Sequence, residues 1–445
     1  MMIRKVFSFM FVGVIILVFS GVEAGGAELL TLKDCISIAL NNNPQIGIAR
    51  QGYRKAQSGL LLNYGRLMPR MSLSFYTGHR FYGPSSVQFD NQGRPVQRNG
   101  FDYEDYTLRF SSDMVLFDGG ATINNIRSSM KSRDAAKEDF MYKRDLIAAQ
   151  VIRAYYNLVR TKMLLHVQEE SVELARKNLE RSEALQQVGS ATRADVLKAK
   201  VRYSNTRLDM IKAKNAVEQA KEDLNALLNR REQTEILVDT TMTVDFYEPD
   251  LKKEVSFALA NRPDLKSLSL SLESAKAGMA AAKSGWYPQL GANFSYSWND
   301  RRMAQNLDFF DNEYMWMITG YLNFNIFDQF ATSSNVSRAK ADCRIAEYNL
   351  EAARLDAVKE IKTIVLNIQQ AEERIGVAEE TVTQAKEDLK LAEERYRVGA
   401  GTMLETIDAQ VALAQAKADV IDAKCDYLIA RADLARATGR RVYSD

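Results

Sequence analysis

The sequence has few of the residues on which catalytic and metal sites depend. Its 445 residues include only two histidines, His79 and His166, and these lie too far apart to form a metal-site spacing. A glycine-rich phosphate loop and a Gly-x-Ser-x-Gly nucleophile motif are also absent. We therefore expect no catalytic residues, no cofactor and no bound metal, and the chain is not predicted to be an enzyme.

Cysteine is scarce as well, and neither sign of charge dominates. The three cysteines, Cys35, Cys343 and Cys425, are odd in number and lie far apart within helical patterns, so a disulfide framework is not expected. The 59 basic and 57 acidic residues give a formal net charge of +2 and are interleaved along the chain. This pattern argues against a nucleic-acid partner, whose binding surface would need clustered positive charge.

Long hydrophobic runs are absent except at the N-terminus. Arg4 and Lys5 form a basic start, an apolar run follows to about Val22, and small residues surround Ala24. This order is typical of a secretory signal peptide, which we predict at residues 1–24. The alternative is an N-terminal membrane anchor, which the small-residue cleavage site makes less favourable. No second apolar stretch of about 20 residues follows it.

The chain repeats itself at fixed offsets. The stretch "LFDGGA" at 116–121 recurs 210 residues later as "IFDQFA" at 326–331. Four of the seven prolines form two pairs that are 219 residues apart: Pro44 with Pro263, and Pro69 with Pro288. Constant offsets over such lengths indicate a tandem duplication. We predict repeats at 25–232 and 233–445.

Each repeat contains two stretches with the period of a β-strand. Apolar and polar or small residues alternate at about 70–82, 103–117, 289–299 and 314–327. One face of each strand is apolar, with Tyr, Trp and Phe gathered toward its ends, and the other face is small and polar. The segments that connect the strands, 82–102 and 299–313, are long and polar.

Very long helices follow each pair of strands. They are predicted at about 121–188, 192–230, 332–398 and 402–438, and a helix of about 66 residues spans roughly 100 Å. No single globular domain contains such a length, so these helices are expected to pack side by side as a coiled coil or helical barrel. The predicted fold is mainly α, internally duplicated, with a membrane β-barrel portion.

Four strands with an apolar outer face are too few for a membrane barrel. An open sheet leaves unpaired backbone groups at its edges in lipid, and membrane barrels need about eight strands to close. Two chains would supply eight strands and three would supply twelve. The alternative is a periplasmic coiled-coil structural or adaptor protein with two surface hairpins.

The chain resembles the outer membrane efflux protein (TolC-like) family over nearly all of its predicted mature length. The resemblance is carried by "SIALNNNPQIGIAR", "NRPDL", "SGWYPQL", the two "FD" strand ends, "RYRVGAGTMLETIDAQVALAQAK" and "YLIARADLARATG". It implies a homotrimer with a twelve-stranded barrel in the outer membrane of a Gram-negative bacterium and a twelve-helix barrel in the periplasm. It also implies a mixed belt from 25–50, about 231–262 and the C-terminal end.

The resemblance further implies a function and partners. Family members are passive exit ducts of tripartite efflux or type I secretion systems. They dock to a periplasmic adaptor protein and an inner-membrane pump of the RND or ABC type. The exported cargo, whether drug, metal or protein, is not readable from the strands.

The two long-helix hairpins are predicted to reverse at glycine turns 210 residues apart. Gly189 and Gly399 are suited to end a helix with φ > 0, and Thr192 and Thr402 are suited to cap the next one. Glu405 completes a predicted capping box, and Asp195 forms a similar but shorter one. By resemblance, the tips are adaptor contacts, and the candidates are Val188, Gly189, Thr192, Arg193, Val398, Gly399, Gly401 and Thr402.

Glu405 and Asp408 are candidates for a gate. By resemblance they occupy positions where family members carry two acidic residues around the closed periplasmic aperture, and Asp195 is a further candidate. Capping alone also explains Glu405, but it does not explain Asp408, one turn further along the helix. Gly401 stands where a basic residue often forms a latch, and the possible substitutes are Arg193, Arg395 and Arg397.

Overall fold

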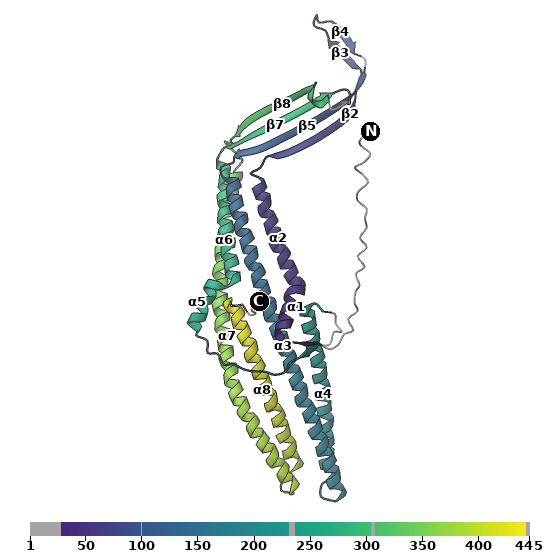
Figure 1. The fold of residues 1–445 in the computed structure, drawn as a ribbon, viewed down its shortest axis with the longest axis vertical. Helices are drawn as coiled ribbons and strands as arrows, with labels where there is room; N and C mark the ends of the chain where they lie inside the picture. Colours follow the sequence, from purple (N-terminus) through teal and green to yellow (C-terminus); the bar gives the residue numbers. More distant parts are fainter. Residues whose placement is uncertain (1–27, 99, 231–235, 304–307, 442–445) are drawn as a thin grey trace, which may run out of the picture.

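The structure is a computed structural model that describes residues 28–98, 100–230, 236–303 and 308–441. The chain is elongated, with a curved sheet at one end and the tips of two helical hairpins at the other (Figure 1). The predicted signal peptide at 1–24 and the predicted repeat boundary at 232 lie outside the described residues.

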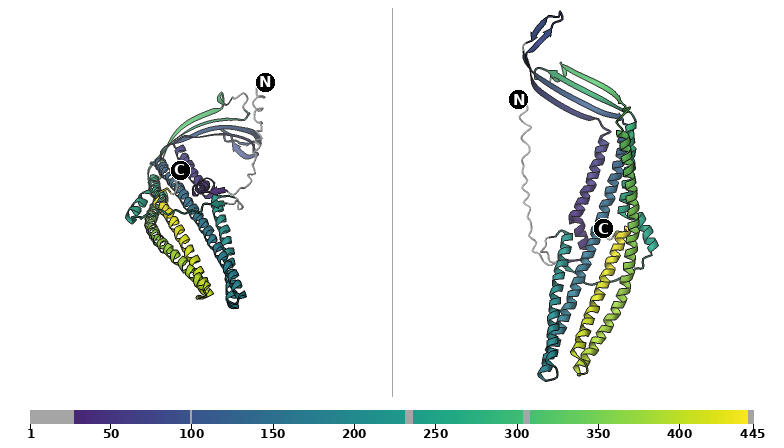
Figure 2. Two further views of the ribbon diagram at one scale, coloured as in Figure 1. Left: turned by 60° about the horizontal axis from the view of Figure 1, so that its bottom comes forward. Right: turned by 180° about the vertical axis from the view of Figure 1, so that it is seen from behind.

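Four long helices form two antiparallel hairpins. Helix α3 (Ala121–Gln187) pairs with α4 (Arg193–Leu228), and α7 (Ala331–Arg397) pairs with α8 (Met403–Thr438). Helices α3 and α7 each have 67 residues, or about 100 Å at 1.5 Å per residue. All four begin and end within two residues of the bounds expected from the sequence. The two hairpins lie side by side and their tips point the same way (Figures 1 and 2).

Shorter helices cover the half of the molecule nearer the sheet. Helices α1 (Leu32–Asn42) and α2 (Pro44–Gly65) belong to the first repeat, and α5 (Leu251–Asn261) and α6 (Pro263–Ala282) are their counterparts in the second. A proline opens α2 and α6 because the first helical position needs no backbone donor. A 3₁₀ turn, η1 (Lys283–Trp286), links α6 to the sheet.

The sheet has four antiparallel strands in the order β2-β5-β7-β8. Its strands are β2 (Arg70–Tyr82), β5 (Phe101–Phe117), β7 (Gln289–Asp300) and β8 (Tyr314–Asn323). The predicted apolar face is confirmed by the register, in which the aligned residues across the sheet are Leu73, Phe110, Tyr296 and Trp316. Such directly paired residues share one face.

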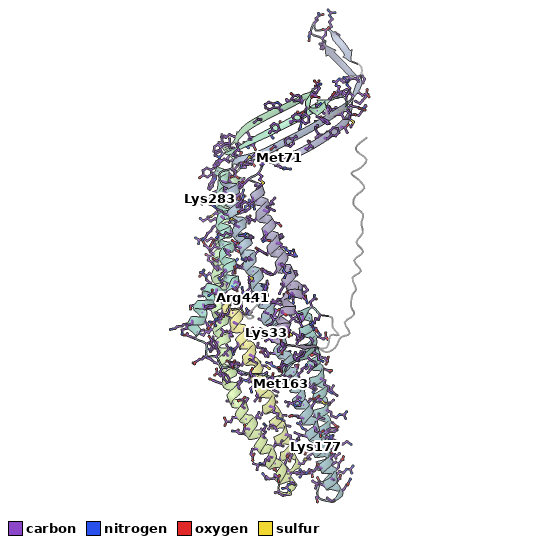
Figure 3. All side chains as sticks on the ribbon, viewed as in Figure 1. Lys33, Met71, Met163, Lys177, Lys283 and Arg441 are labelled. Atoms are coloured by element: carbon purple, nitrogen blue, oxygen red, sulfur yellow. The ribbon has the colours of Figure 1, made fainter. Side chains whose placement is uncertain are left out.

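The other face of the sheet is polar and hydrogen-bonded across strands. The Ser72 and Ser111 hydroxyls lie 2.8 Å apart, and the Asn293 amide donates to the Asp113 carboxylate at 2.6 Å. Met71, on the apolar face, lies at the sheet end of the molecule in Figure 3. The hydrogen-bonded face is the more polar of the two faces without being uniformly polar, because it also carries apolar residues, among them Val115, Met315 and Met317.

Two features near the sheet differ from expectation. Strand β8 ends at Asn323 rather than 327, because Asn323 pairs with Gln289, the first residue of β7, and Pro288 precedes it. The segment 82–102, expected to be a polar connection, contains a hairpin of β3 (Ser85–Phe89) and β4 (Pro95–Arg98). Another 3₁₀ turn, η2 (Asp308–Phe310), lies between β7 and β8. Among the described residues, the helices do not reach the length and apolarity needed to cross a membrane.

The main hydrophobic cores lie midway along the molecule. One core includes Val151, Leu158 and Leu224 of the first repeat, and beside it β1 (Glu28–Leu30) pairs in parallel with β6 (Ile236–Val238), which follows the predicted repeat boundary. The corresponding core of the second repeat includes Ile361, Ile368 and Tyr427. The three cysteines are buried and form no disulfide within the described residues.

The two repeats use the same clamp between a helix start and a helix end. The Asn43 amide donates to the Leu227 carbonyl at 2.9 Å, and the Arg262 guanidinium donates to the Ala437 carbonyl at 3.0 Å. Position 262 is 219 residues after 43, and 437 is 210 residues after 227, so both contacts follow the offsets of the duplication. The clamp ties α2 to the end of α4, and α6 to the end of α8.

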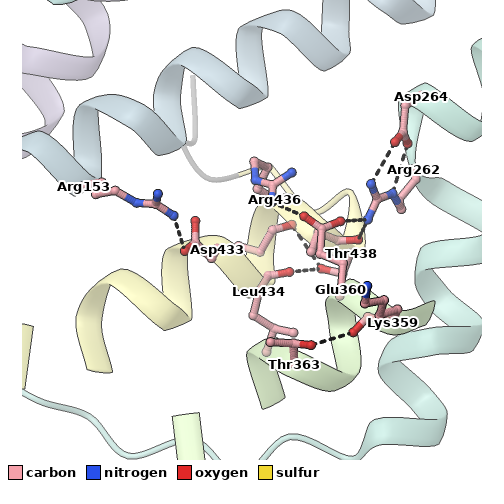
Figure 4. Close-up of polar contacts among 12 residues, drawn as sticks. Arg153, Arg262, Asp264, Lys359, Glu360, Thr363, Asp433, Leu434, Arg436 and Thr438 are labelled. Atoms are coloured by element: carbon pink, nitrogen blue, oxygen red, sulfur yellow. Dashed lines mark hydrogen bonds and ion pairs between the residues drawn. The ribbon is translucent and has the colours of Figure 1, made fainter. Parts of the chain in front are cut away.

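The clamp of the second repeat is extended by ion pairs (Figure 4). Arg262 contacts Asp264 at 2.8 Å and Glu360 at 2.6 Å, and Arg436 contacts Glu360 at 2.5 Å. Burial opposes ionisation of Glu360, but hydrogen bonds from both arginines hold the pKa of its carboxyl below its usual value.

Ion pairs also join α3 of the first repeat to α8 of the second. Arg153 contacts Asp433 at 2.8 Å (Figure 4), and Lys417 contacts Glu170 at 2.5 Å closer to the tips. Between these pairs, Arg160 contacts Asp426. The two hairpins are therefore held together along the stretch between the cores and the tips.

Candidate functional site at the helical hairpin tips

The glycine turns have the conformation expected from the sequence. Gly189 has φ 77° and Gly399 has φ 74°, in the left-handed region that favours glycine. In the first tip the Ser190 amide donates to the Leu185 carbonyl at 2.8 Å, and in the second the Ala400 amide donates to the Arg395 carbonyl at 2.9 Å. Both turns satisfy the last carbonyls of a 67-residue helix.

The helices that leave the tips are capped by threonines, but the two caps differ. Thr192 and Asp195 form a complete capping box: the Asp195 amide donates to the Thr192 hydroxyl at 3.2 Å and the Thr192 amide donates to the Asp195 carboxylate at 3.1 Å. Hydrogen bonds from the Thr192 hydroxyl and amide lower the pKa of the Asp195 carboxyl.

At the second tip the predicted capping box is only half formed. The Glu405 amide donates to the Thr402 hydroxyl at 3.2 Å, but the Glu405 carboxylate does not receive the Thr402 amide. The prediction that Glu405 would cap better than Asp195 is therefore wrong. The Glu405 carboxylate instead accepts a hydrogen bond from the Thr402 hydroxyl at 3.3 Å and lies 3.7 Å from the Arg395 guanidinium.

The packing around Gly401 is tight. A Cβ atom at that position would lie 3.0 Å from Arg395 Cβ and 3.2 Å from Glu405 Oε2. Arg395 also donates to the Ala400 carbonyl at 3.4 Å. Of the three arginines considered as substitutes for a basic residue at 401, Arg395 thus contacts Glu405. Arg397 contacts Glu394 at 2.6 Å instead.

Asp408 lies one turn beyond Glu405 on α8, and its side chain is exposed. Among the described residues, neither a hydrogen bond nor an ion pair engages its carboxylate. Glu405 is half-buried, and so is Asp195 at the other tip. The structure therefore separates the three candidate gate residues: Asp195 serves a cap, Glu405 contacts an arginine, and Asp408 faces solvent.

The remaining tip candidates form an exposed surface. Val188 and Val398, the last residues before the turns, are 73% and 68% exposed although both are apolar. Arg193 begins α4 and is exposed. Lys177, three turns before the first tip, marks the same end of the molecule in Figure 3.

One contact between the tips was not anticipated from the sequence. The Arg181 guanidinium of α3 lies 5.7 Å from the centre of the Tyr396 ring of α7, which joins the first repeat to the second. The Tyr396 hydroxyl is buried and lacks a hydrogen-bond partner in the described residues. The only sequence signal was an aromatic residue in "RYRVG" where the first repeat has "LQQVG".

A known protein family matches both repeats. The model of the outer membrane efflux protein family matches residues 35–230 and 255–440. The chain belongs to the outer membrane efflux protein family. The resemblance seen in the sequence is confirmed, and the two matched segments follow the internal duplication.

Individual efflux and secretion proteins are similar over most of their length. The chain is 24% identical over 418 residues to the pyoverdine export outer membrane protein OpmQ of Pseudomonas putida, covering 92% of this chain and 85% of that relative. It is 20% identical over 415 residues to the alkaline protease secretion protein AprF of Pseudomonas aeruginosa, covering 92% and 84%. The solved structure of the outer membrane protein VceC of Vibrio cholerae aligns with TM-score 0.79 and 18% identity over 93% of this chain and 97% of that one.

As an outer membrane efflux protein, the chain combines a membrane β-barrel portion with an α-barrel portion. It is an exit duct for efflux or type I secretion, located in the outer membrane with a large periplasmic part. The channels of this family are passive homotrimers that work with adaptor and pump partners. The alternative of a periplasmic coiled-coil structural or adaptor protein is therefore not retained.

Proposed function

We propose that three copies of this chain close one twelve-stranded barrel and act as a passive, non-enzymatic duct. The observation that carries this is the four-stranded sheet, in which β2 and β8 are edge strands with unpaired backbone groups on one side. Three chains with four strands each give twelve, and pairing β8 with β2 of the next copy removes every edge. The polar face of the sheet then lines the water-filled interior.

Apolar residues on the helices support the same assembly. Helix α4 carries Leu197, Val201, Leu208 and Ile211, each at least half exposed, at spacings typical of a coiled-coil seam. Helix α7 carries a similar row, exposed in the single chain: Leu355, Leu366, Val377 and Leu391. Leu391 of α7 and Val201 of α4 lie at similar distances from the hairpin tips along their helices, and so do Val377 of α7 and Ile211 of α4. We propose that α4 of one copy packs against α7 of the next.

The hairpin tips are proposed as the adaptor contact. The exposed Val188 and Val398 give each tip an apolar point beside the polar caps, which is a suitable surface for the ends of another helical hairpin. An inner-membrane pump of the RND or ABC type is proposed to supply the energy, as the resemblance to the family implies. One relative is named for pyoverdine export and another for alkaline protease secretion, so both efflux and type I secretion fit the family.

Asp408 is proposed as the principal gate residue, with Glu405 as a weaker second. Three exposed Asp408 carboxylates around one axis would concentrate negative charge and attract cations. The Glu405 charge is partly offset by Arg395 at 3.7 Å. Conductance in planar bilayers tests this: Asp408→Ala should weaken block by divalent cations more than Glu405→Ala does.

The control for this test is Asp209→Ala, which removes a carboxylate that pairs with Lys212 on α4, away from the tips. Divalent cations should block the Asp209→Ala channel to the same extent as the unmodified channel. Equal block in the Asp408→Ala channel and the unmodified channel would remove the gate role and leave the duct intact. Absence of any conductance from the unmodified protein would instead count against the duct itself.

A further inference from the structure

The two strand-to-helix junctions have the same backbone conformation but different sequences. In the first repeat, Gly119 and Gly120 have φ 66° and 85°. The residues 210 positions later, Gln329 and Phe330, have φ 57° and 66°. Each junction is closed by the same aspartate cap, in which the backbone amide of Thr122 or Thr332 donates to the aspartate four residues earlier at 2.8 Å.

The second junction is therefore strained where the first is not. Glycine adopts the left-handed region freely, but a residue with a Cβ atom does so at a cost in free energy. Two consecutive residues of this kind persist only where surrounding contacts hold them. In the single chain such contacts are few: Phe330 and Phe327 are both 72% exposed and touch each other edge-to-face, with ring centres 5.6 Å apart.

The first junction shows what lies beside such a turn. A Cβ atom at Gly119 would lie 2.8 Å from both the Ser284 carbonyl oxygen and Tyr287 Cβ. Ser284 and Tyr287 belong to the second repeat, just after α6, so this is the boundary between repeats within one chain. Glycine is required there because the two repeats approach too closely for a side chain.

Because the chain is duplicated, an equivalent contact is expected at the boundary between neighbouring chains. The counterparts of Ser284 and Tyr287, 219 residues earlier, are Gly65 and Met68, just before edge strand β2. The junction at Gln329 and Phe330 follows the other edge strand, β8. In a closed ring of repeats, the second junction of one chain therefore faces residues 65–68 of the next. Met68 is 70% exposed in the single chain.

We propose that residues 326–330 of one chain dock on residues 65–68 of a second copy at the neck between barrel and helices. This rests on the proposed homotrimer. Because Gln329 carries a side chain where Gly119 has none, the boundary between chains is wider than the boundary within a chain. The rings of Phe327 and Phe330 fill that space against Leu67 and Met68, and the burial offsets the backbone strain.

Cysteine cross-linking tests the contact directly. The three natural cysteines, which are buried, are replaced by serine, and Gln329→Cys is combined with Met68→Cys. The matching Cβ positions within a chain lie 2.8 Å apart, and a slightly wider boundary approaches the separation of about 3.8 Å that a disulfide needs. Mild oxidation of the membrane-embedded trimer should give covalent dimers and trimers in denaturing gels.

The matched control pairs Gln329→Cys with Leu61→Cys, seven residues earlier on α2 and 72% exposed. It should remain unlinked, because about 10 Å of helix separates it from Met68. A native trimer in which the Gln329→Cys and Met68→Cys pair stays unlinked, or in which both pairs link equally, overturns the inference while the trimer stands. A chain that forms no trimer overturns the proposed assembly as well.

A second experiment separates strain from docking. Gln329→Gly and Phe330→Gly both relieve a left-handed residue, so relief of strain alone would make both trimers more resistant to heat. If Phe330 docks on the next chain, Phe330→Gly should instead lower the temperature at which trimers dissociate in detergent, and Gln329→Gly should not. Equal or higher resistance of the Phe330→Gly trimer contradicts the proposal.

Discussion

Removal of the Arg262 side chain should loosen the second repeat more than the matching change loosens the first. The Arg262 side chain is 7% exposed and joins the start of α6 to the Ala437 carbonyl and to Glu360. It also contacts Asp264 in the first turn of α6 (Figure 4). Its counterpart Asn43 makes only a carbonyl contact and a helix cap. The variants to compare are Arg262→Ala and Asn43→Ala.

The expected magnitudes follow from burial and from the partners left behind. Removing one member of a buried ion pair costs about 3–5 kcal/mol. The side chains of Asp264 and Glu360 are 23% and 31% exposed, and Glu360 keeps Arg436. We therefore expect about 2–3 kcal/mol for Arg262→Ala. Asn43→Ala loses a cap and one hydrogen bond, or about 1 kcal/mol.

Hydrogen exchange read by mass spectrometry localises the effect to one helix end. A loss of 2–3 kcal/mol corresponds to roughly 30- to 150-fold faster exchange in the last turns of α8, if these amides exchange by local opening. Asn43→Ala should accelerate exchange about fivefold at the end of α4 and leave α8 unchanged. Arg262→Gln, which retains a donor for the Ala437 carbonyl, should fall between Arg262→Ala and the unmodified protein. If the amides of α8 exchange no faster in Arg262→Ala than in Asn43→Ala, the assignment of these contacts is refuted.

Three further outcomes follow from the same contacts. Burial raises the pKa of the Asp145 carboxyl to about 6, so its ionised form increasingly disfavours folding as pH rises from about 4 to 6. Asp145→Asn should therefore increase the free energy of unfolding by about 2–3 kcal/mol at pH 8 and by about half as much at pH 5. Urea unfolding at the two pH values measures this difference. Asp195→Ala should cost about 1 kcal/mol at its tip, and Glu405→Ala less, because only Asp195 completes a capping box; exchange of tip amides checks the order. Leu391→Glu should prevent or weaken trimer assembly, whereas Lys390→Glu at the neighbouring position should not. Size-exclusion chromatography with light scattering measures the oligomeric state of each variant.

Much of the fold was predictable because the duplication repeats every local signal. A proline opens α2 and again α6, and a glycine ends each 67-residue helix. Period-two alternation placed the apolar face of the sheet correctly, since the pairing register aligns Leu73 with Phe110. These signals act over a few residues, so they are visible without the tertiary structure.

What could not be predicted depends on partners distant in the sequence. The Arg262 clamp joins residues 98 and 175 positions apart. The contact of Arg181 with Tyr396 requires the two hairpins to be side by side. Even the short-range capping box at Thr402 was misjudged, because the Glu405 carboxylate contacts the Thr402 hydroxyl and Arg395 rather than the Thr402 amide.

The candidate site was predicted in position but not in the role of each residue. Sequence placed Asp195, Glu405 and Asp408 at the tips, and the structure distinguishes a cap, an arginine partner and an exposed carboxylate. That distinction is what singles out Asp408 for the gate experiment.

The stoichiometry of the protein in a lipid bilayer tests the central claim most directly. Native mass spectrometry of the chain, extracted from outer membranes and held in lipid nanodiscs, should show three copies per particle, whose four-stranded sheets together supply the twelve strands of the proposed barrel. A single copy in the nanodisc, or recovery of the chain only from the soluble periplasmic fraction, would contradict the account.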